Sequence, residues 1–251
     1  MTGWMKIPAK QKLIRFLPVL IIVILLGAGV IYITDDYDAS PSAAALLDED
    51  IPYVTVTQQT GRVIFRPEQI RAGLIFYPGG KVDYIAYAPL MVKLAARGFL
   101  CVLVKMPLQL AFLNADAADS VYADFPETEH WYLAGHSLGG VAAALYAKDH
   151  TEKLDGLILL ASYSTSDLRE SGLKVLSIYG SDDGVLNRDA YNKNRSNLPE
   201  STAEIVIPHG NHASFGDYGP QKGDGVSSLG IGEQIESTAG IISSWAYENK
   251  K

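Results

Sequence analysis

Cysteine is almost absent from the chain, because Cys101 is the single one among 251 residues. One cysteine forms no disulfide within the chain, and it excludes the cysteine-rich sites that hold structural zinc or iron–sulfur clusters. Cys101 lies in an apolar run over 99–104, where a thiol is expected to pack as a small buried side chain. The sequence therefore predicts a domain that a hydrophobic core holds together.

Motifs for nucleotides and metal ions are missing as well. The Gly-Gly-Lys run at 79–81 lacks the spacing of a phosphate-binding loop, and no serine or threonine follows the lysine. The loop 216–225 contains Asp217 and Asp224 but not the pattern of a calcium-binding loop, and we expect it to form a wall of a pocket. We expect no metal and no cofactor.

Basic side chains are scarce beyond the first part of the chain. The chain holds 21 Lys and Arg against 28 Asp and Glu, and residues 1–34 contain four of the basic ones and none of the acidic ones. Residues 35–251 therefore carry 17 basic and 28 acidic side chains, a net charge of −11. So acidic a domain has no electrostatic surface for nucleic acid, and most of its carboxylates are expected on a solvated surface.

One uncharged apolar run is long enough to cross a membrane, at residues 16–33. Basic residues precede it and acidic residues follow it: Lys6, Lys10, Lys12 and Arg15, then Asp35, Asp36 and Asp38. This asymmetry predicts a cytoplasmic N-terminus over 1–15, a transmembrane signal anchor over 16–33, a linker over 34–51 and a domain over 52–251. We expect a single-pass protein of the cell membrane with this domain outside the cytoplasm.

Cleavage of the same segment as a signal peptide is the alternative. A cleaved signal needs a shorter apolar region with small residues just after it. The candidate positions near Ala39 and Ala43 lie several residues beyond the apolar run. An anchor that stays attached is therefore the favoured interpretation.

The rest of the chain alternates short apolar runs with helical patterns. Near-continuous Val, Ile and Leu runs are typical of parallel strands that helices cover on both faces. Strands are expected at 53–57, 62–65, 73–77, 99–104, 131–134, 156–161, 175–179 and 203–207, and helices at 83–97, 108–124, 138–149, 187–197 and 231–248. The pattern predicts an α/β fold with a mostly parallel sheet, flanked by helices and preceded by an antiparallel hairpin. Only about a dozen residues separate the strands at 156–161 and 175–179, so no cap domain fits there.

A Gly-His-Ser-Leu-Gly pentapeptide at 135–139 lies between one of these strands and a helical pattern. In that context it is typical of a nucleophile elbow, a sharp turn that presents a serine hydroxyl at the edge of a sheet. Small residues on either side of the serine let strand and helix approach closely. Ser137 is the predicted nucleophile.

An acid and a histidine follow Ser137 in the order that such a site requires. The strand at 175–179 leads into Asp182 and Asp183, of which Asp183 is the predicted acid and Asp182 the alternative. The strand at 203–207 leads into His209 and His212. His212, flanked by small residues, is the predicted base, and His209 is expected to support it from nearby.

Backbone amides are expected to bind the negatively charged oxygen that forms during acyl transfer. One donor would be the amide of Leu138, directly after the serine. The second would come from Gly80 or Lys81, in the glycine-containing loop after the strand at 73–77.

Taken together, these segments resemble the α/β-hydrolase superfamily, and in particular its small cap-less members of the dienelactone-hydrolase-like, or α/β-hydrolase family 5, group. The matching segments lie at 76–82, 135–140, 179–184 and 210–219. The resemblance implies a triad of Ser137, Asp183 and His212 that transfers an acyl group to serine and then to water. Dienelactone hydrolase itself uses a cysteine nucleophile, so the serine departs from that enzyme.

The expected function is that of a carboxylesterase-like serine hydrolase, which cleaves an ester or related acyl bond of a small-molecule substrate. The alternatives are a membrane-tethered acyltransferase on the same scaffold and a hydrolase-fold binding module without catalysis. The expected partners are the acyl substrate and, through the anchor, the membrane, with no nucleic acid.

Overall fold

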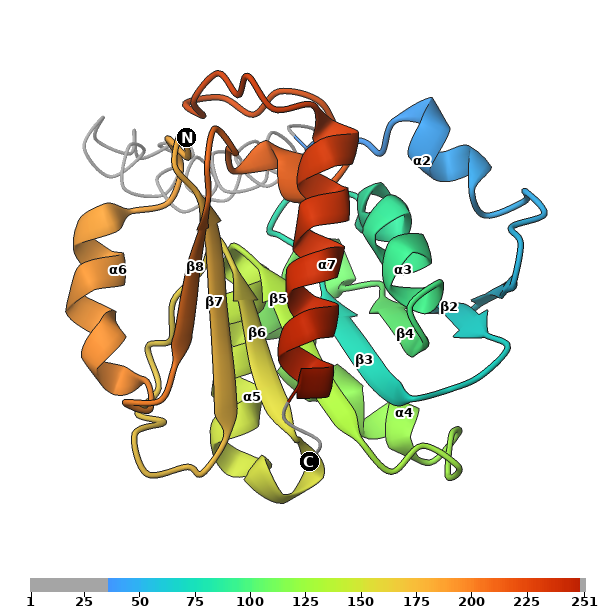
Figure 1. Ribbon diagram of the computed structural model, residues 1–251, viewed down its shortest axis with the longest axis horizontal. Helices are drawn as coiled ribbons and strands as arrows, with labels where there is room; N and C mark the ends of the chain where they lie inside the picture. The colour runs from blue at the N-terminus through green and yellow to red at the C-terminus, as the bar shows by residue number, and fades with distance from the viewer. Residues whose placement is uncertain (1–35, 249–251) are drawn as a thin grey trace, which may run out of the picture. The chain divides into compact units, whose positions relative to one another are not determined.

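Eight strands form one sheet in the computed structural model of the protein, which describes residues 36–248 (Figure 1). Their order across the sheet is β1-β2-β4-β3-β5-β6-β7-β8. The strands β3 to β8 are parallel, whereas β2 is antiparallel to both β1 and β4. The strands are Val54–Gln59 (β1), Arg62–Pro67 (β2), Ala72–Tyr77 (β3), Phe99–Val104 (β4), Trp131–His136 (β5), Gly156–Leu160 (β6), Lys174–Gly180 (β7) and Ala203–Ile207 (β8). The predicted mostly parallel sheet with an N-terminal hairpin is confirmed.

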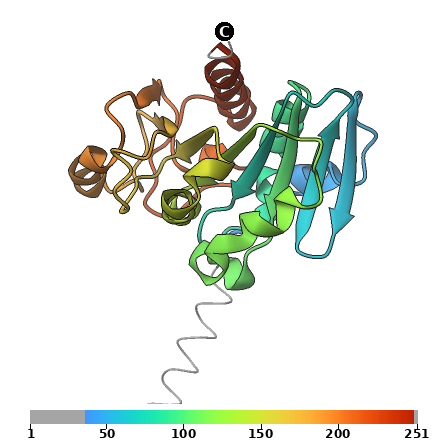
Figure 2. The same cartoon turned by 90° about the horizontal axis from the view of Figure 1, so that it is seen from below.

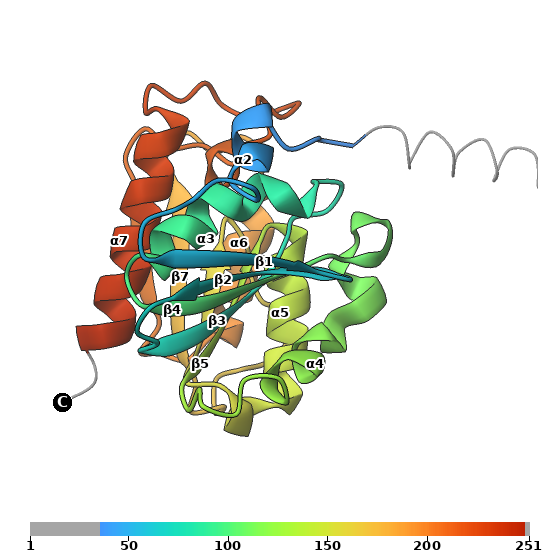
Figure 3. The same ribbon diagram turned by 90° about the vertical axis from the view of Figure 1, so that its right-hand side faces the viewer.

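Helices cover both faces of this sheet (Figures 2 and 3). The helices α3 (Ala88–Ala95) and α7 (Ile231–Glu248) lie on one face, α4 (Asp119–Tyr122) and α5 (Leu138–Asp149) on the other, and α6 (Arg188–Asn194) follows β7. Because alternate residues of a strand face opposite sides, Leu74 belongs to one hydrophobic core and Ile75 to the other. Every residue of β3, β4, β5 and β6 is buried as a result. The chain passes from β6 to β7 without a helix, as expected for a fold that lacks a cap.

Short 3₁₀ segments connect several of these elements. They are η1 (Tyr84–Tyr87), η2 (Pro107–Gln109), η3 (Ala111–Ala118), η4 (Thr151–Lys153), η5 (Arg195–Asn197) and η6 (Ala213–Phe215). The helix predicted over 108–124 is therefore wrong, since η2, η3 and α4 divide that stretch. Leu108 has a left-handed backbone (φ 50°) and Asn114 also departs from helical dihedrals. Many side chains of the stretch are exposed, so little packing energy rewards a regular helix.

The compact domain begins earlier than the sequence predicted. It starts at Tyr37, within the segment expected to be a linker over 34–51. The Tyr37 amide donates to the Lys81 carbonyl at 2.7 Å, and the Asp83 amide donates to the Tyr37 carbonyl at 2.8 Å. The short helix α2 (Pro41–Ala45) follows, and the side chain of Ser40 caps it by accepting the Ala43 amide. Residues 37–45 are thus part of the domain and lie against the loop after β3.

Between residues 36 and 248, no helix is long and apolar enough to span a membrane. The N-terminus predicted over 1–15 and the anchor predicted over 16–33 lie outside the described residues.

Candidate active site

The predicted site residues all follow strands at the same edge of the sheet. Ser137 follows β5, Asp183 follows β7, His212 follows β8, and Gly80 with Lys81 follows β3. These strands are parallel, so their carboxyl ends meet at one edge, the usual place for a site in an open α/β sheet.

Ser137 occupies a strained turn between β5 and α5. Its backbone is left-handed (φ 50°, ψ −122°), a conformation that residues other than glycine adopt rarely and at an energetic cost. The Ser137 amide donates to the Leu160 carbonyl at 2.9 Å, and the hydroxyl of Ser162 donates to the Ser137 carbonyl at 2.7 Å. These two hydrogen bonds hold the turn in place on β6 and the loop that follows it.

Close backbone contact explains why glycine lies two positions after the serine. A Cβ atom on Gly139 would lie 2.3 Å from the carbonyl oxygens of Tyr77 and Pro78. Those carbonyls belong to backbone that cannot rotate aside. Only glycine lets the first turn of α5 lie directly on the end of β3.

Asp183 and His212 form a buried pair. Nδ1 of His212 lies 2.9 Å from Oδ2 of Asp183, and both side chains are almost completely shielded from solvent. The other carboxylate oxygen, Oδ1, accepts the amides of Val185 and Leu186 at 2.9 and 2.7 Å. These contacts fix the orientation of the carboxylate and, through it, the imidazole.

The protonation states follow from this environment. Burial raises the pKa of Asp183, but the hydrogen bonds from His212, Leu186 and Val185 outweigh burial and leave the pKa below its usual value. An ionised carboxylate only accepts hydrogen bonds, so Nδ1 of His212 carries the proton. Nε2 of His212 is then the ring nitrogen with a lone pair, and it is buried with no hydrogen-bond partner among the described residues.

The alternative acid and base pair with each other instead. Asp182 and His209 lie on the surface, with 3.8 Å between Oδ2 of Asp182 and Nδ1 of His209. The Asp182 carboxylate also accepts the hydroxyl of Ser181. The structure therefore brings Asp183 together with His212 and leaves Asp182 and His209 outside the buried pair.

A cavity of about 160 Å³ joins Ser137 and His212. Apolar side chains form much of its wall: Leu138, Val141, Ala161, Val185 and Leu186. Ser162 and Tyr163, in the loop after β6, line it as well. Its lining suits a small, partly apolar group.

Two of the candidate amide donors lie side by side. A Cβ atom on Gly80 would lie 2.8 Å from Cδ2 of Leu138, so the loop after β3 contacts the start of α5. The Lys81 amide donates to the Gln109 carbonyl at 3.1 Å. No such acceptor among the described residues takes the Gly80 amide.

Comparison with known proteins identifies the family of this domain. A model of the alpha/beta hydrolase family matches residues 73–236, well over half of the chain. The chain belongs to the alpha/beta hydrolase family. The matched region contains Ser137, Asp183 and His212.

Solved structures share the hydrolase fold at low sequence identity. A dienelactone hydrolase from Anabaena variabilis is 16% identical with a TM-score of 0.58, over 78% of this chain and 98% of that one. A carboxylesterase from Bacillus subtilis is 12% identical with a TM-score of 0.59, over 83% of this chain and 95% of that one. A bacterial membrane phospholipase A is 16% identical with a TM-score of 0.55, over 92% of this chain and 97% of that one. No curated protein matches the chain in sequence.

A buried tyrosine, which the sequence did not reveal, connects two loops of this hydrolase. The Tyr87 hydroxyl accepts the Gly79 amide at 3.0 Å and lies 2.7 Å from Nδ1 of His136. Its own proton is therefore available to His136, which burial keeps neutral by moving its pKa well below the usual value. Through Tyr87, His136 ties the end of β5 to the loop that carries Gly80.

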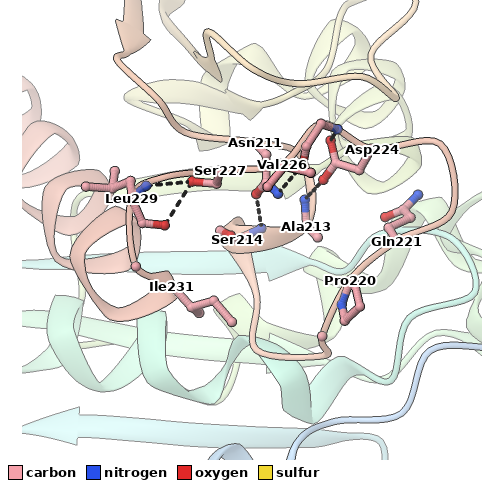
Figure 4. Close-up of a pocket in the computed structure, with 13 residues that line it drawn as sticks. Asn211, Ala213, Ser214, Pro220, Gln221, Asp224, Val226, Ser227, Leu229 and Ile231 are labelled. Carbon is pink, nitrogen blue, oxygen red and sulfur yellow. Dashed lines mark hydrogen bonds between the residues drawn. The ribbon is translucent and has the colours of Figure 1, made fainter.

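Asp224 also holds site loops together (Figure 4). Its Oδ1 accepts the amides of Gly184 at 3.1 Å and His212 at 3.2 Å, and its Oδ2 accepts the Ala213 amide at 2.8 Å. Gly184 belongs to the acid loop, whereas the other two belong to the histidine loop. One carboxylate thus links the loops that carry Asp183 and His212.

The loop 216–225 was expected to form a pocket wall, and part of it does. It lines a cavity of about 410 Å³ on the outer side of the histidine loop, together with Asn211 and Ile231 (Figure 4). Neither Ser137 nor His212 lines that cavity. The sequence singled out Asp224 but offered no role for it, because its partners are backbone amides distant in sequence.

Two further histidines and the cysteine lie outside the candidate site. His130 is exposed and lies 2.9 Å from the Asp155 carboxylate, while His150 stacks on Tyr146 at the end of α5. Cys101 is buried in β4, and burial raises the pKa of its thiol, so it is an unreactive core side chain.

Proposed function

We propose that this protein is a serine hydrolase of the carboxylesterase type, which cleaves an ester or related acyl bond of a small-molecule substrate. The observation that carries the proposal is the buried Asp183–His212 pair, whose unpartnered Nε2 belongs to a residue lining the same cavity as Ser137. Carboxylesterase and dienelactone hydrolase activities are named for proteins of the same fold. Fold alone does not decide activity, so the geometry of the site carries the weight.

In the first half of the proposed reaction, Oγ of Ser137 attacks the acyl carbon while Nε2 of His212 takes the hydroxyl proton. Asp183 stabilises the imidazolium that results. The tetrahedral intermediate collapses to an acyl-enzyme, and the imidazolium donates its proton to the departing alcohol. In the second half, water attacks the acyl carbon in the same way and releases the acid.

We assign the two oxyanion donors to the amides of Leu138 and Gly80. The Leu138 amide lies at the first turn of α5, where helix amides lack partners within the helix. Gly80 is chosen over Lys81 because the Lys81 amide already donates to the Gln109 carbonyl. Each such donor is worth about 3 kcal/mol to the transition state in hydrolases of this chemistry.

We further propose that residues 16–33 anchor the chain in the cell membrane, with the catalytic domain outside the cytoplasm. The length of the uncharged run and the charges around it support this location. Retention of residues 1–15 in the membrane fraction of cells would distinguish an anchor from a cleaved signal.

A fluorophosphonate probe tests the proposed chemistry directly. It should modify Ser137 in the folded protein, because Ser137 lines the same cavity as His212, the proposed base. Mass analysis of the peptide that contains Ser137 gives the answer. A folded protein that does not react would favour the binding module, whereas a reactive protein that prefers an added alcohol to water would favour the acyltransferase.

A further inference from the structure

We propose that the edge of the domain beside the active site docks on the bilayer surface, and that the site takes its acyl ester from the membrane. The inference deepens the proposed hydrolase function and relies on the proposed anchor. Three features of the same edge carry it: an exposed apolar segment, its contact with the loop that bears Gly80, and the point at which the chain enters the domain.

The exposed segment lies between β4 and α4. Residues 106–115 contain no charged side chain, although the domain around them is strongly acidic. Leu108 is 60% exposed, Phe112 44% and Leu113 56%. In Figure 3 the bright green loops that lead toward α4 project beyond the strands. Three large apolar side chains exposed within six residues indicate a place of contact. We call residues 107–113 the apolar loop.

The backbone of the apolar loop holds its side chains outward at a cost. Leu108 and Gln109 both have left-handed backbones, with φ of 50° and 55°. Two consecutive non-glycine residues in this region are strained, and such strain persists where the surroundings enforce it. Here Met106 and Ala111 are buried on either side, so the segment is fastened at both ends while Leu108 faces solvent.

The apolar loop touches the active site. The Gln109 carbonyl accepts the Lys81 amide at 3.1 Å, one residue from Gly80. A cavity of about 270 Å³ lies between the two segments, lined on one side by Pro78 and Val82 and on the other by Met106 and Gln109. A membrane surface that binds the apolar loop would therefore lie close to the opening of the active site.

The N-terminal end of the domain joins the same loop. The Tyr37 amide donates to the Lys81 carbonyl at 2.7 Å, and Tyr37 follows Ile33, the last residue of the apolar run, by four residues. Four residues span at most about 14 Å, whatever their conformation. If residues 16–33 span the bilayer, the loop that carries Lys81 lies within that distance of the membrane surface.

The occupant of the apolar loop is therefore the lipid surface rather than a second protein. An anchor that ends this close restricts the domain to the neighbourhood of the bilayer, where the uncharged apolar loop gains by entering the interface. A substrate that reaches the site along this surface is an acyl ester with its chain in the membrane.

Fluorescence quenching tests the docking. Cys101 is buried and its thiol unreactive, so a cysteine introduced at the surface takes up a thiol-reactive nitrobenzoxadiazole dye selectively. The full chain would carry Leu113→Cys or, as the matched control, Tyr53→Cys. Tyr53 is 74% exposed and precedes β1 at the opposite edge of the sheet. Neutral phosphatidylcholine vesicles with nitroxide-labelled acyl chains should quench the dye at 113 at least threefold more than at 53. Equal quenching overturns the docking.

Turnover tests the substrate class. The full chain in phosphatidylcholine vesicles would hydrolyse 4-methylumbelliferyl oleate, which resides in the bilayer, and 4-methylumbelliferyl acetate, which is soluble and has the same leaving group. In the Phe112→Ser/Leu113→Ser variant the oleate-to-acetate ratio of kcat/KM should fall at least fivefold, whereas Tyr53→Ser/Leu145→Ser should preserve it. An unchanged ratio overturns the membrane-borne substrate. If the wild type hydrolyses neither ester, both the proposed hydrolase function and the membrane-borne substrate are overturned. The quenching experiment then still decides whether the domain docks on the bilayer.

Discussion

Replacement of Asp224 should impair turnover more than binding, because this carboxylate positions the loops of Asp183 and His212 without lining the cavity that contains Ser137. Asp224→Ala removes three hydrogen bonds that cross between segments, those from the amides of Gly184, His212 and Ala213. At about 1 kcal/mol for each net hydrogen bond, the free energy of unfolding should fall by about 3 kcal/mol. The side chain is only half-buried, so water replaces part of this loss.

The kinetic consequence is larger than the loss of stability suggests. A reacting group displaced by about 1 Å costs about 100-fold in rate, so kcat for a short acyl ester should fall by about that factor with KM nearly unchanged. Urea unfolding and steady-state kinetics on the same preparation separate the two effects. Asp217→Ala is the matched control, because Asp217 lies in the same loop but accepts the hydroxyls of Ser40 and Ser42. A kcat within twofold of wild type in the destabilised Asp224→Ala protein would refute the positioning role.

Three further substitutions test other contacts around the site. Gly139→Ala should destabilise the protein by more than about 3 kcal/mol in urea, because its Cβ would lie 2.3 Å from the carbonyl oxygens of Tyr77 and Pro78; Gly240→Ala in α7, whose Cβ would have nothing within 4 Å, should not destabilise it. Asp183→Asn should lower kcat about 10⁴-fold. Because folding lowers the pKa of Asp183, the wild type should be more stable than this variant above the pKa of the unfolded chain. That difference in the free energy of unfolding should disappear as the pH falls through the pKa of the folded protein. Between pH 7 and 5 the wild type should lose more stability than His136→Gln. Burial lowers the pKa of His136 in the folded protein, so the unfolded chain binds a proton that the folded protein does not; equal pH slopes would contradict this.

The strands were predictable because local patterns encode them, and so was the edge of the sheet at which the candidate site residues meet. Each of the eight apolar runs between residues 53 and 207 became a strand, and parallel strands necessarily bring the loops after β5, β7 and β8 to one edge. The sequence favours Asp183 over Asp182 only through its position at the turn after the strand at 175–179. The buried hydrogen bond to His212 now supports that choice, and Asp182 instead faces His209 on the surface.

Contacts between segments far apart in the chain could not be predicted from the sequence. The Lys81 amide looked equivalent to that of Gly80 until the fold brought the Gln109 carbonyl to it. The apolar residues over 108–124 suggested a helix, and nothing local signalled the left-handed backbone at Leu108. Asp224 binds backbone amides, which leave no trace in a sequence, so only the structure links it to the site.

The decisive measurement is turnover of a short acyl ester by the Ser137→Ala variant. The substitution removes only Oγ, at a half-buried position, so the urea unfolding curve should remain within about 1 kcal/mol of wild type. Turnover should fall by at least about 10⁴-fold, which leaves only the residual rate that the oxyanion donors and substrate binding supply. Wild-type-like turnover by the folded variant would contradict the assignment of Ser137 as the nucleophile and, with it, the proposed mechanism.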